Sequence, residues 1–171
     1  NTILGPEFVN WCGPASVIEH FGGAAIHYPP GAFGQNNLDV AERIVEHVRA
    51  EVPEDACVAE FYAGVGAIGL SLLPRVREIR IQERARVLHL GEEADDRILL
   101  LPLLDLLLGA VALRVEQPPE RFLYVSCGLE SFVEDTARLT SGGKLRLSGL
   151  TAFNLMPFTE HVETVARFER A

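Results

Sequence analysis

The sequence predicts an α/β fold, a doubly wound and mostly parallel sheet, from three observations. A short buried strand over residues 57–62 is followed by a glycine turn over residues 63–67 and a helix over residues 68–73. A second strand is expected over residues 78–82, and a parallel α/β sheet begins with this order of elements. Another buried strand is expected over residues 121–126. Hydrophobic residues make up 48% of the 171 residues, enough for one domain with a core.

The remaining elements are predicted from periodicity and turn residues. Gly, Pro and short apolar runs over residues 1–34 indicate hairpin strands and turns. An apolar stripe at helical spacing predicts a helix over residues 38–52, which Pro53 ends. The rest of the chain is expected to form a helix over residues 131–139 ended by Gly142 and Gly143, a strand over residues 144–151 and a last strand over residues 162–168.

An apolar run from Ile98 to Val115 is long enough to suggest a membrane span. Pro102, Asp105 and Arg114 interrupt this run, and charged residues are costly inside a bilayer. We therefore expect a buried helix or a helix–strand pair here, and no association with a membrane.

The chain is acidic, with a formal net charge of −9. Nucleic-acid-binding proteins usually carry a basic footprint, so such binding would require a local basic face or another domain. The three cysteines, Cys12, Cys57 and Cys127, are odd in number and widely separated, which argues against a disulfide framework and against a metal site. Reduced cysteines and the absence of signal-peptide regions at the N-terminus favour a cytoplasmic location.

The glycine turn has the features of a nucleoside-binding site. Glu60, Gly64 and Gly66 form an acidic–glycine–glycine pattern at a turn whose backbone N–H groups can point at a ligand. Glu83 lies at the end of the next strand, where a carboxylate can accept hydrogen bonds from ribose hydroxyls. The simpler alternative is a plain tight turn with a surface Glu. Gly69 completes a dinucleotide fingerprint, so a nicotinamide-dependent enzyme such as a dehydrogenase also stays open.

Three residues near the C-terminus suggest chemistry at the same edge of the sheet. Cys127 follows the strand over residues 121–126, and the carboxyl ends of parallel strands face the ligand crevice. His161 and Glu163 would share one side of a strand, and a carboxylate beside a His suits proton transfer. The alternatives are a buried structural Cys and a solvated strand end.

Four blocks together resemble the RNA uracil-5-methyltransferases, which act on transfer or ribosomal RNA. They are PGAFGQNN over residues 30–37, EFYAGVG over residues 60–66, YVSC over residues 124–127 and MPFTEHVE over residues 156–163.

The resemblance implies a fold, a cofactor and a set of roles. The fold would be the class I methyltransferase (Rossmann-like) version of the doubly wound sheet, ending in an antiparallel strand. Residues 38–171 would form the catalytic domain, preceded by a hairpin and turn segment over residues 1–37. Cys127 would be the nucleophile and Glu163 the general base. The residues that would touch S-adenosylmethionine are Gln35, Tyr62, Gly64 and Glu83.

The implied chemistry requires these residue types. Carbon 5 of uracil is a weak nucleophile until a thiolate adds to carbon 6. A base must then remove the proton from carbon 5 after the methyl group has been transferred, and the target base must leave its stack to reach the pocket. The resemblance also implies that the partner is tRNA or rRNA; its identity and the oligomeric state stay open.

The middle of the chain departs from the family pattern. An Asp-Pro-Pro-Arg motif typical of the family is absent, and Gln117 to Arg121 is no equivalent because it runs directly into the Cys strand. Only residues 84–120 separate Glu83 from that strand, too few for two strands and three helices. We therefore expect at least one strand–helix unit to be lost or replaced by the Leu-rich run. A non-catalytic remnant or a minimal engineered scaffold of the same fold is the alternative.

Overall fold

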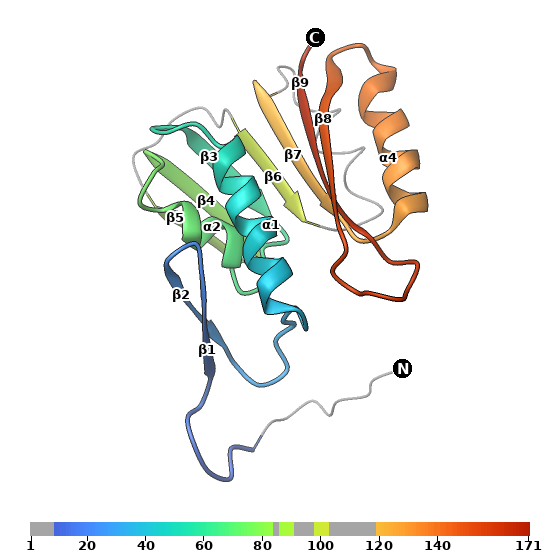
Figure 1. Ribbon diagram of the computed structural model, residues 1–171. Helices are drawn as coiled ribbons and strands as arrows, with labels where there is room; N and C mark the ends of the chain where they lie inside the picture. Colours follow the sequence, from blue (N-terminus) through green and yellow to red (C-terminus); the bar gives the residue numbers. More distant parts are fainter. Residues whose placement is uncertain (1–8, 84–85, 91–97, 103–118) are drawn as a thin grey trace.

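The computed structural model describes residues 9–83, 86–90, 98–102 and 119–171, with side chains described outside residues 83–118. Figure 1 shows one large sheet and a separate two-stranded hairpin. Within the described residues the sheet has seven strands in the order β5-β4-β3-β6-β7-β9-β8. These strands are β3 (Cys57–Phe61), β4 (Glu78–Glu83), β5 (Arg86–Leu90), β6 (Ile98–Pro102), β7 (Arg121–Ser126), β8 (Leu145–Phe153) and β9 (Glu163–Arg170).

The sheet is mostly parallel. The strands β3, β4, β6, β7 and β8 run in one direction, whereas β5 and β9 run in the opposite direction. The last strand, β9, lies between β7 and β8 and pairs antiparallel with both. The predicted doubly wound, mostly parallel sheet that ends in an antiparallel strand is therefore confirmed.

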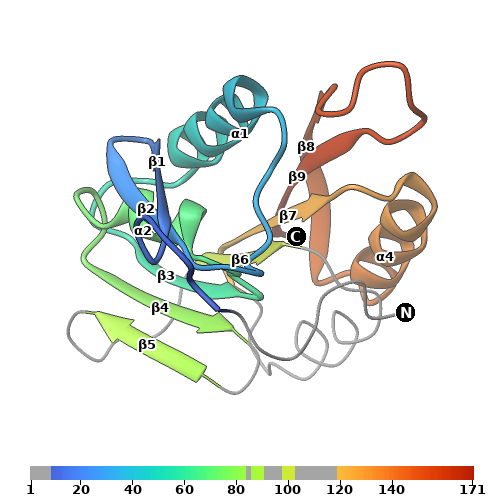
Figure 2. The ribbon, with the colours of Figure 1, turned by 90° about the horizontal axis from the view of Figure 1, so that it is seen from below.

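Alternation along the strands gives the sheet two apolar faces. In β7, Leu123 and Val125 belong to the cluster beneath the helices α1 (Leu38–Glu51) and α2 (Ala67–Leu72). Phe122 and Tyr124 point to the other face, where α4 (Leu129–Ser141) covers them. Figure 2 shows α1 and α4 on opposite sides of the sheet. Because successive side chains of a strand point to opposite faces, this central strand supplies both cores.

The hairpin of β1 (Val17–Phe21) and β2 (Ala24–Tyr28) packs on α1. Phe21 and Ile26 are buried against Ala41 and Val45 of this helix. The amide of Gly22 in the hairpin turn donates to the Glu42 carboxylate, with N···O distances of 3.0 and 3.1 Å. The hairpin is thereby held over the sheet edge at which β3 ends.

The start of α1 is fixed by Asn37. Its side-chain oxygen accepts a hydrogen bond from the Val40 amide at 3.3 Å, which is the usual role of Asn at a helix N-cap. Its side-chain nitrogen donates to the Leu155 carbonyl at 3.4 Å. One residue therefore both starts α1 and connects it to the segment after β8.

The middle of the chain contains strands that the sequence did not reveal. β5 was not predicted, and Ile98–Pro102 at the start of the Leu-rich run forms β6, which pairs parallel with β3 and β7. Residues 103–115 of that run lie outside the described residues. Only residues 84 and 85 separate β4 from the antiparallel β5, too few for a crossover helix. The connection between β4 and β5 therefore has no helix, and most of the Leu-rich run that was expected to replace a strand–helix unit lies outside the described residues.

None of the helices that the structure describes is long and apolar enough to cross a membrane.

Candidate functional site

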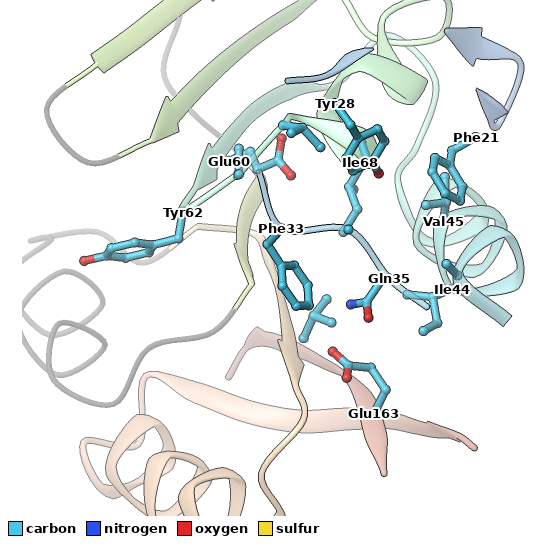
Figure 3. Close-up of a pocket in the computed structure, with 17 residues that line it drawn as sticks. Phe21, Tyr28, Phe33, Gln35, Ile44, Val45, Glu60, Tyr62, Ile68 and Glu163 are labelled. Atoms are coloured by element: carbon cyan, nitrogen blue, oxygen red, sulfur yellow. The ribbon is translucent and has the colours of Figure 1, made fainter. Parts of the chain in front are cut away.

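A cavity of about 520 Å³ opens where β3, β7 and β9 reach one edge of the sheet. Its walls come from the hairpin, from the segment before α1, from α1 and α2, and from the turn that follows β3 (Figure 3). Ligands in open α/β sheets bind at this edge, beyond the carboxyl ends of the parallel strands. The cavity therefore lies where the fold predicts a ligand site.

The walls are largely apolar. Phe21 and Tyr28 of the hairpin, Ile44 of α1, Ile68 of α2 and Val125 of β7 all line the cavity. The hairpin residues carry no chemical motif, and no local sequence signal predicted that they would form a wall. Such walls with a few polar groups are typical of small-molecule sites.

The turn after β3 adopts unusual backbone angles. Gly64 has φ of 60° and Gly66 has φ of 80°, in the left-handed region that glycine adopts without strain. Tyr62 has φ of 57°, which is strained for a residue with a side chain, and such strain is often found at ligand sites. The Gly66 amide donates to the Ala63 carbonyl at 2.8 Å, which closes the turn. The backbone of this turn therefore forms a fixed wall of the cavity.

The third glycine of the motif serves packing. A Cβ atom on Gly69 of α2 would collide with the Glu60 carboxylate and would come within 2.8 Å of Ile81 Cδ1. Only glycine allows α2 to lie this close to β3 and β4. This packing explains Gly69 without a dinucleotide ligand.

Glu60 is a carboxylate in a core position. It lies on the same face of β3 as Val58, lines the cavity, and is 1% exposed. Neither of its oxygens has a hydrogen-bond partner of normal geometry among the described residues. Burial raises the pKa of Glu60 to about 8, and the nearby Gly69 amide opposes this rise only in part. Glu60 is therefore mostly protonated at neutral pH.

Glu163, the first residue of β9, is the second buried carboxylate of the cavity. It is 4% exposed, and burial raises its pKa above the usual range. Val165, two residues along β9, belongs to the cluster beneath α1, so strand alternation directs Glu163 to the same face. In Figure 3 its carboxylate approaches from the side opposite Glu60.

Cys127 and Glu163 flank the last residue pair of β7 and β9. Ser126 and Thr164 form that pair; Cys127 follows Ser126 in the chain, and Glu163 precedes Thr164. The Thr164 hydroxyl donates to the Ser126 carbonyl at 3.0 Å, which holds the two strands together at this point. Cys127 is half-buried, and the residues that line the cavity do not include it.

The helix that follows Cys127 is fixed by a buried hydrogen bond. The Tyr124 hydroxyl of β7 donates to Asp135 Oδ2 of α4 at 2.8 Å, and the Asp135 side chain is 2% exposed. Arg138 Nη1 lies 3.5 Å from the other Asp135 oxygen. Because α4 begins at Leu129, this contact also fixes the backbone around Cys127.

The predicted site residues are brought together in part. Gln35, Tyr62, Gly64 and Glu163 line the cavity. The Tyr62 ring is directed away from the labelled groups of the cavity in Figure 3 and packs with the cluster beneath α4. Glu83 is the last residue of β4, and its side chain is outside the described part of the chain. His161 precedes β9 and is exposed, so the shared strand face expected for His161 and Glu163 does not form.

The curated proteins to which this chain is similar include RNA methyltransferases. An uncharacterized RNA methyltransferase of Protochlamydia amoebophila is 31% identical over 206 aligned positions, which cover 99% of this chain and 52% of that protein. The 23S rRNA (uracil(1939)-C(5))-methyltransferase RlmD of Aeromonas hydrophila is 28% identical over 86% of this chain and 41% of its own length. The chain thus spans about half the length of the curated relatives it matches. The first alignment has more positions than the chain has residues, so that relative carries residues within the matched region that this chain lacks.

Solved structures share the fold. The Pyrococcus abyssi tRNA (uracil-54, C5)-methyltransferase, solved with S-adenosyl-L-homocysteine, matches 92% of this chain and 45% of its own with a TM-score of 0.70 and 21% identity. TYW2 of M. jannaschii, solved with AdoMet, matches 96% of this chain and 90% of its own with a TM-score of 0.59 and 12% identity. No family model matches the chain.

The raised pKa of Glu60 predicts a pH-dependent effect of Glu60→Gln on stability. The unfolded chain releases this proton near pH 4.5 and the folded chain near pH 8. The contribution of Glu60 to stability is therefore most favourable below pH 4.5 and is lost as the pH rises towards 8. The Gln variant, which carries no proton to lose, should gain stability over the wild type across this window, by a few kcal/mol near pH 8.

Urea unfolding at intervals from pH 4.5 to pH 8.5 measures this difference. Glu46→Gln, on the exposed side of α1, is the matched control and should show no such trend. A constant difference between Glu60→Gln and the wild type across the window would contradict the assignment.

Proposed function

We propose, from the premise that the chain belongs to the family of the RNA uracil-5-methyltransferases, that it is a catalytic domain that transfers a methyl group from S-adenosylmethionine to carbon 5 of a uridine in tRNA or rRNA. The single observation that carries the proposal is the end of the β7–β9 register: Cys127 follows Ser126 and Glu163 precedes Thr164, the last pair of the two strands, and Glu163 lines the cavity. A thiol and a carboxyl are the two groups that this reaction needs.

The cavity suits a nucleoside cofactor. Its volume of about 520 Å³ lies within the range of small-molecule sites, and the glycine turn allows a ligand to approach the backbone closely. Gln35, Tyr62, Gly64 and Glu83 are the residues proposed to hold S-adenosylmethionine. When bound, the cofactor supplies an electrophilic methyl group.

Cys127 is proposed to form the covalent bond that activates the base. Its thiolate sulfur adds to carbon 6 of the uracil ring, and the electron pair moves through the ring to make carbon 5 nucleophilic. Cys127 lies two residues before the start of α4, and the positive end of the helix dipole favours a negative charge there. After carbon 5 has gained its methyl group and lost its proton, the C6–S bond breaks and the thiolate leaves.

Glu163 is proposed to remove the proton from carbon 5. Its carboxylate must be ionised to accept that proton, and the raised pKa makes it a stronger base than an exposed Glu.

Base stacking is the proposed mode of contact with the flipped uridine. Phe33 lines the cavity, yet its side chain is 73% exposed. An aromatic ring at the mouth of a pocket can stack on a base removed from its RNA stack. Such contact does not depend on the net charge of the domain, which is −9.

Covalent trapping tests the role of Cys127. RNA that contains 5-fluorouridine has no proton on carbon 5 for a base to remove, so the adduct with the thiol should persist. Together with S-adenosylmethionine it should give a protein–RNA band that survives denaturation. Cys127→Ala should abolish this band, whereas Cys12→Ala, at an exposed position outside the cavity, should keep it. An adduct that forms equally well without Cys127 would refute the nucleophile, and no adduct in the wild type would favour the non-catalytic alternative.

Glu163→Gln tests the base separately from the nucleophile. The amide cannot accept the proton, so turnover should fall by about 10²- to 10⁴-fold. With ordinary uridine RNA the variant should accumulate the methylated adduct, since the step blocked comes after Cys127 has added. Mass spectrometry of the covalent complex detects this species. Loss of turnover without any adduct would instead indicate that Glu163 acts before the thiol adds.

A further inference from the structure

The edge of the sheet around the candidate site exposes apolar side chains and few charges. Four of the segments that the structure describes lie at this edge: residues 29–37, 62–66, 127–133 and 154–162. Together they contain two carboxylates and one His, and no Lys or Arg. RNA held by these segments is therefore contacted through its bases rather than through its phosphates. The large apolar side chains that they expose are Phe33, Leu129, Val133 and Phe158.

Phe158 is the most exposed of these side chains. It belongs to the loop that joins β8 to β9, lies five residues before Glu163, and is fully exposed. Figure 1 shows this loop projecting beyond the end of the sheet at which α1 begins. Phe158 belongs to none of the hydrophobic clusters formed by the described residues. Single exposed apolar residues are common, so its backbone conformation is the more informative observation.

The backbone at Phe158 is strained. Residues 156–159 form a turn that is closed by a hydrogen bond from the Thr159 amide to the Met156 carbonyl at 3.3 Å. Phe158, the third residue of this turn, has φ of 67°. Pro157 holds φ at about −65° at the second position, so the turn has the pattern of type II, in which glycine or Asn is favoured third. A Phe kept at this strained position is expected where its ring serves binding.

The turn presents the ring on a fixed backbone. Thr159 Oγ1 donates to the Met156 carbonyl at 2.8 Å, and the His161 amide donates to Thr159 Oγ1 at 3.2 Å. The side chain of Thr159 thus connects the start of the turn to the residues that lead into β9. A ring on a backbone that is already ordered loses little conformational freedom when it binds a ligand.

The loop is also joined to the segment that carries Phe33. Leu155, directly before the turn, is buried in the cluster beneath α1, and its carbonyl accepts the hydrogen bond from the Asn37 side chain. Phe33 lies four residues before Asn37, and Phe158 lies three residues after Leu155. Two exposed aromatic rings therefore come from two segments that are connected to each other at the cavity end of the sheet.

We propose that Phe158 is an RNA-binding residue whose ring stacks on the unpaired base next to the target uridine, outside the cavity. The inference rests on the proposed function, in which that uridine enters the cavity, and it adds a contact for its neighbour in the RNA. Every nucleobase has a flat π face, so such stacking accepts any base and needs no positive charge on the protein. No covalent bond forms or breaks in this contact.

Replacement of the ring should weaken RNA binding and leave the reaction unchanged. The probe is a pentauridylate with a central 5-fluorouridine, and the rate of adduct formation with S-adenosylmethionine is measured against RNA concentration. Phe158→Leu keeps an apolar side chain without a stacking face, so the half-saturating RNA concentration should rise by about five- to a hundredfold at an unchanged maximal rate. Phe158→Trp should bind as the wild type does. Leu147→Ala, at an exposed apolar position of β8, is the matched control.

Removal of the partner base identifies the contact. In two further probes the nucleotide before or after the 5-fluorouridine carries no base. One of these probes should lose affinity for the wild type by the same factor as Phe158→Leu does, and should cause no further loss in that variant. Losses that simply add would show that the ring and the neighbouring base act independently, and would overturn the stacking contact.

Two measurements separate stacking from an indirect effect of the substitution. The ratio of the affinities of the wild type and Phe158→Leu should be the same at about 50 mM and about 200 mM salt, because stacking releases no counterions. Phe158→Gly removes the strain at φ of 67°, so it should resist urea at least as well as the wild type while RNA binding falls. Lower stability of both variants would assign Phe158 to the fold and overturn the proposal.

Fluorescence anisotropy of a labelled pentauridylate measures binding without any adduct. Equal affinities of the wild type and Phe158→Leu, with the adduct still formed, would overturn this inference and leave the proposed function intact. Binding that depends on Phe158 without an adduct would contradict the proposed reaction and support the RNA contact. A wild type that binds no RNA but self-associates, with a concentration-dependent mass that Phe158→Leu abolishes, would assign the ring to a contact between copies and overturn the proposal.

Discussion

The antiparallel insertion of β9 between β7 and β8 is the constraint on which the candidate site depends. It brings together two chain segments that lie about thirty-five residues apart in the sequence, and it fixes their register from Arg121↔Glu169 to Ser126↔Thr164. A shift of one residue would turn Glu163 to the opposite face of the sheet, away from the cavity. The buried contacts of Phe122, Tyr124 and Phe168 make that shift costly, because each would lose its place in the core beneath α4.

The groups that could take part in catalysis or binding at this site also lower the stability of the fold. Two carboxyls lie in a largely apolar cavity, and burial raises the pKa of both. A fold optimised for stability alone would have an apolar residue at position 60, between α2 and the sheet. Position 60 instead carries Glu60, and only a glycine at position 69 leaves room for its carboxylate. Such a combination is expected where a binding site is kept at a cost in folding stability.

Much of the fold followed from local sequence signals. The helix over residues 38–52, the strand over residues 121–126 and the glycine turn carry strong periodicity or special backbone requirements, and the structure confirms them. β5 was missed because Arg86–Leu90 is short and the two residues that join it to β4, Arg84 and Ala85, carry no turn signal such as Gly or Asn. Periodicity also could not separate strand from helix in the run that begins at Ile98, which is a general ambiguity of short apolar segments. The cavity walls from the hairpin arise from tertiary packing, for which Phe21 and Tyr28 give no local signal.

A disulfide trap tests the register most directly. In a Cys12→Ser background, Glu163→Cys would place a thiol opposite Cys127, and residues directly opposite on antiparallel strands have Cα atoms about 4.5–5.5 Å apart, within the reach of a disulfide. We predict rapid disulfide formation under mild oxidation, seen as the loss of two thiols by mass spectrometry. Glu160→Cys, in the exposed loop before β9, should remain reduced. Failure of the Cys127–position 163 bond to form, or equal bonding from position 160, would contradict the account that strand pairing brings together Cys127 and Glu163, the proposed nucleophile and base.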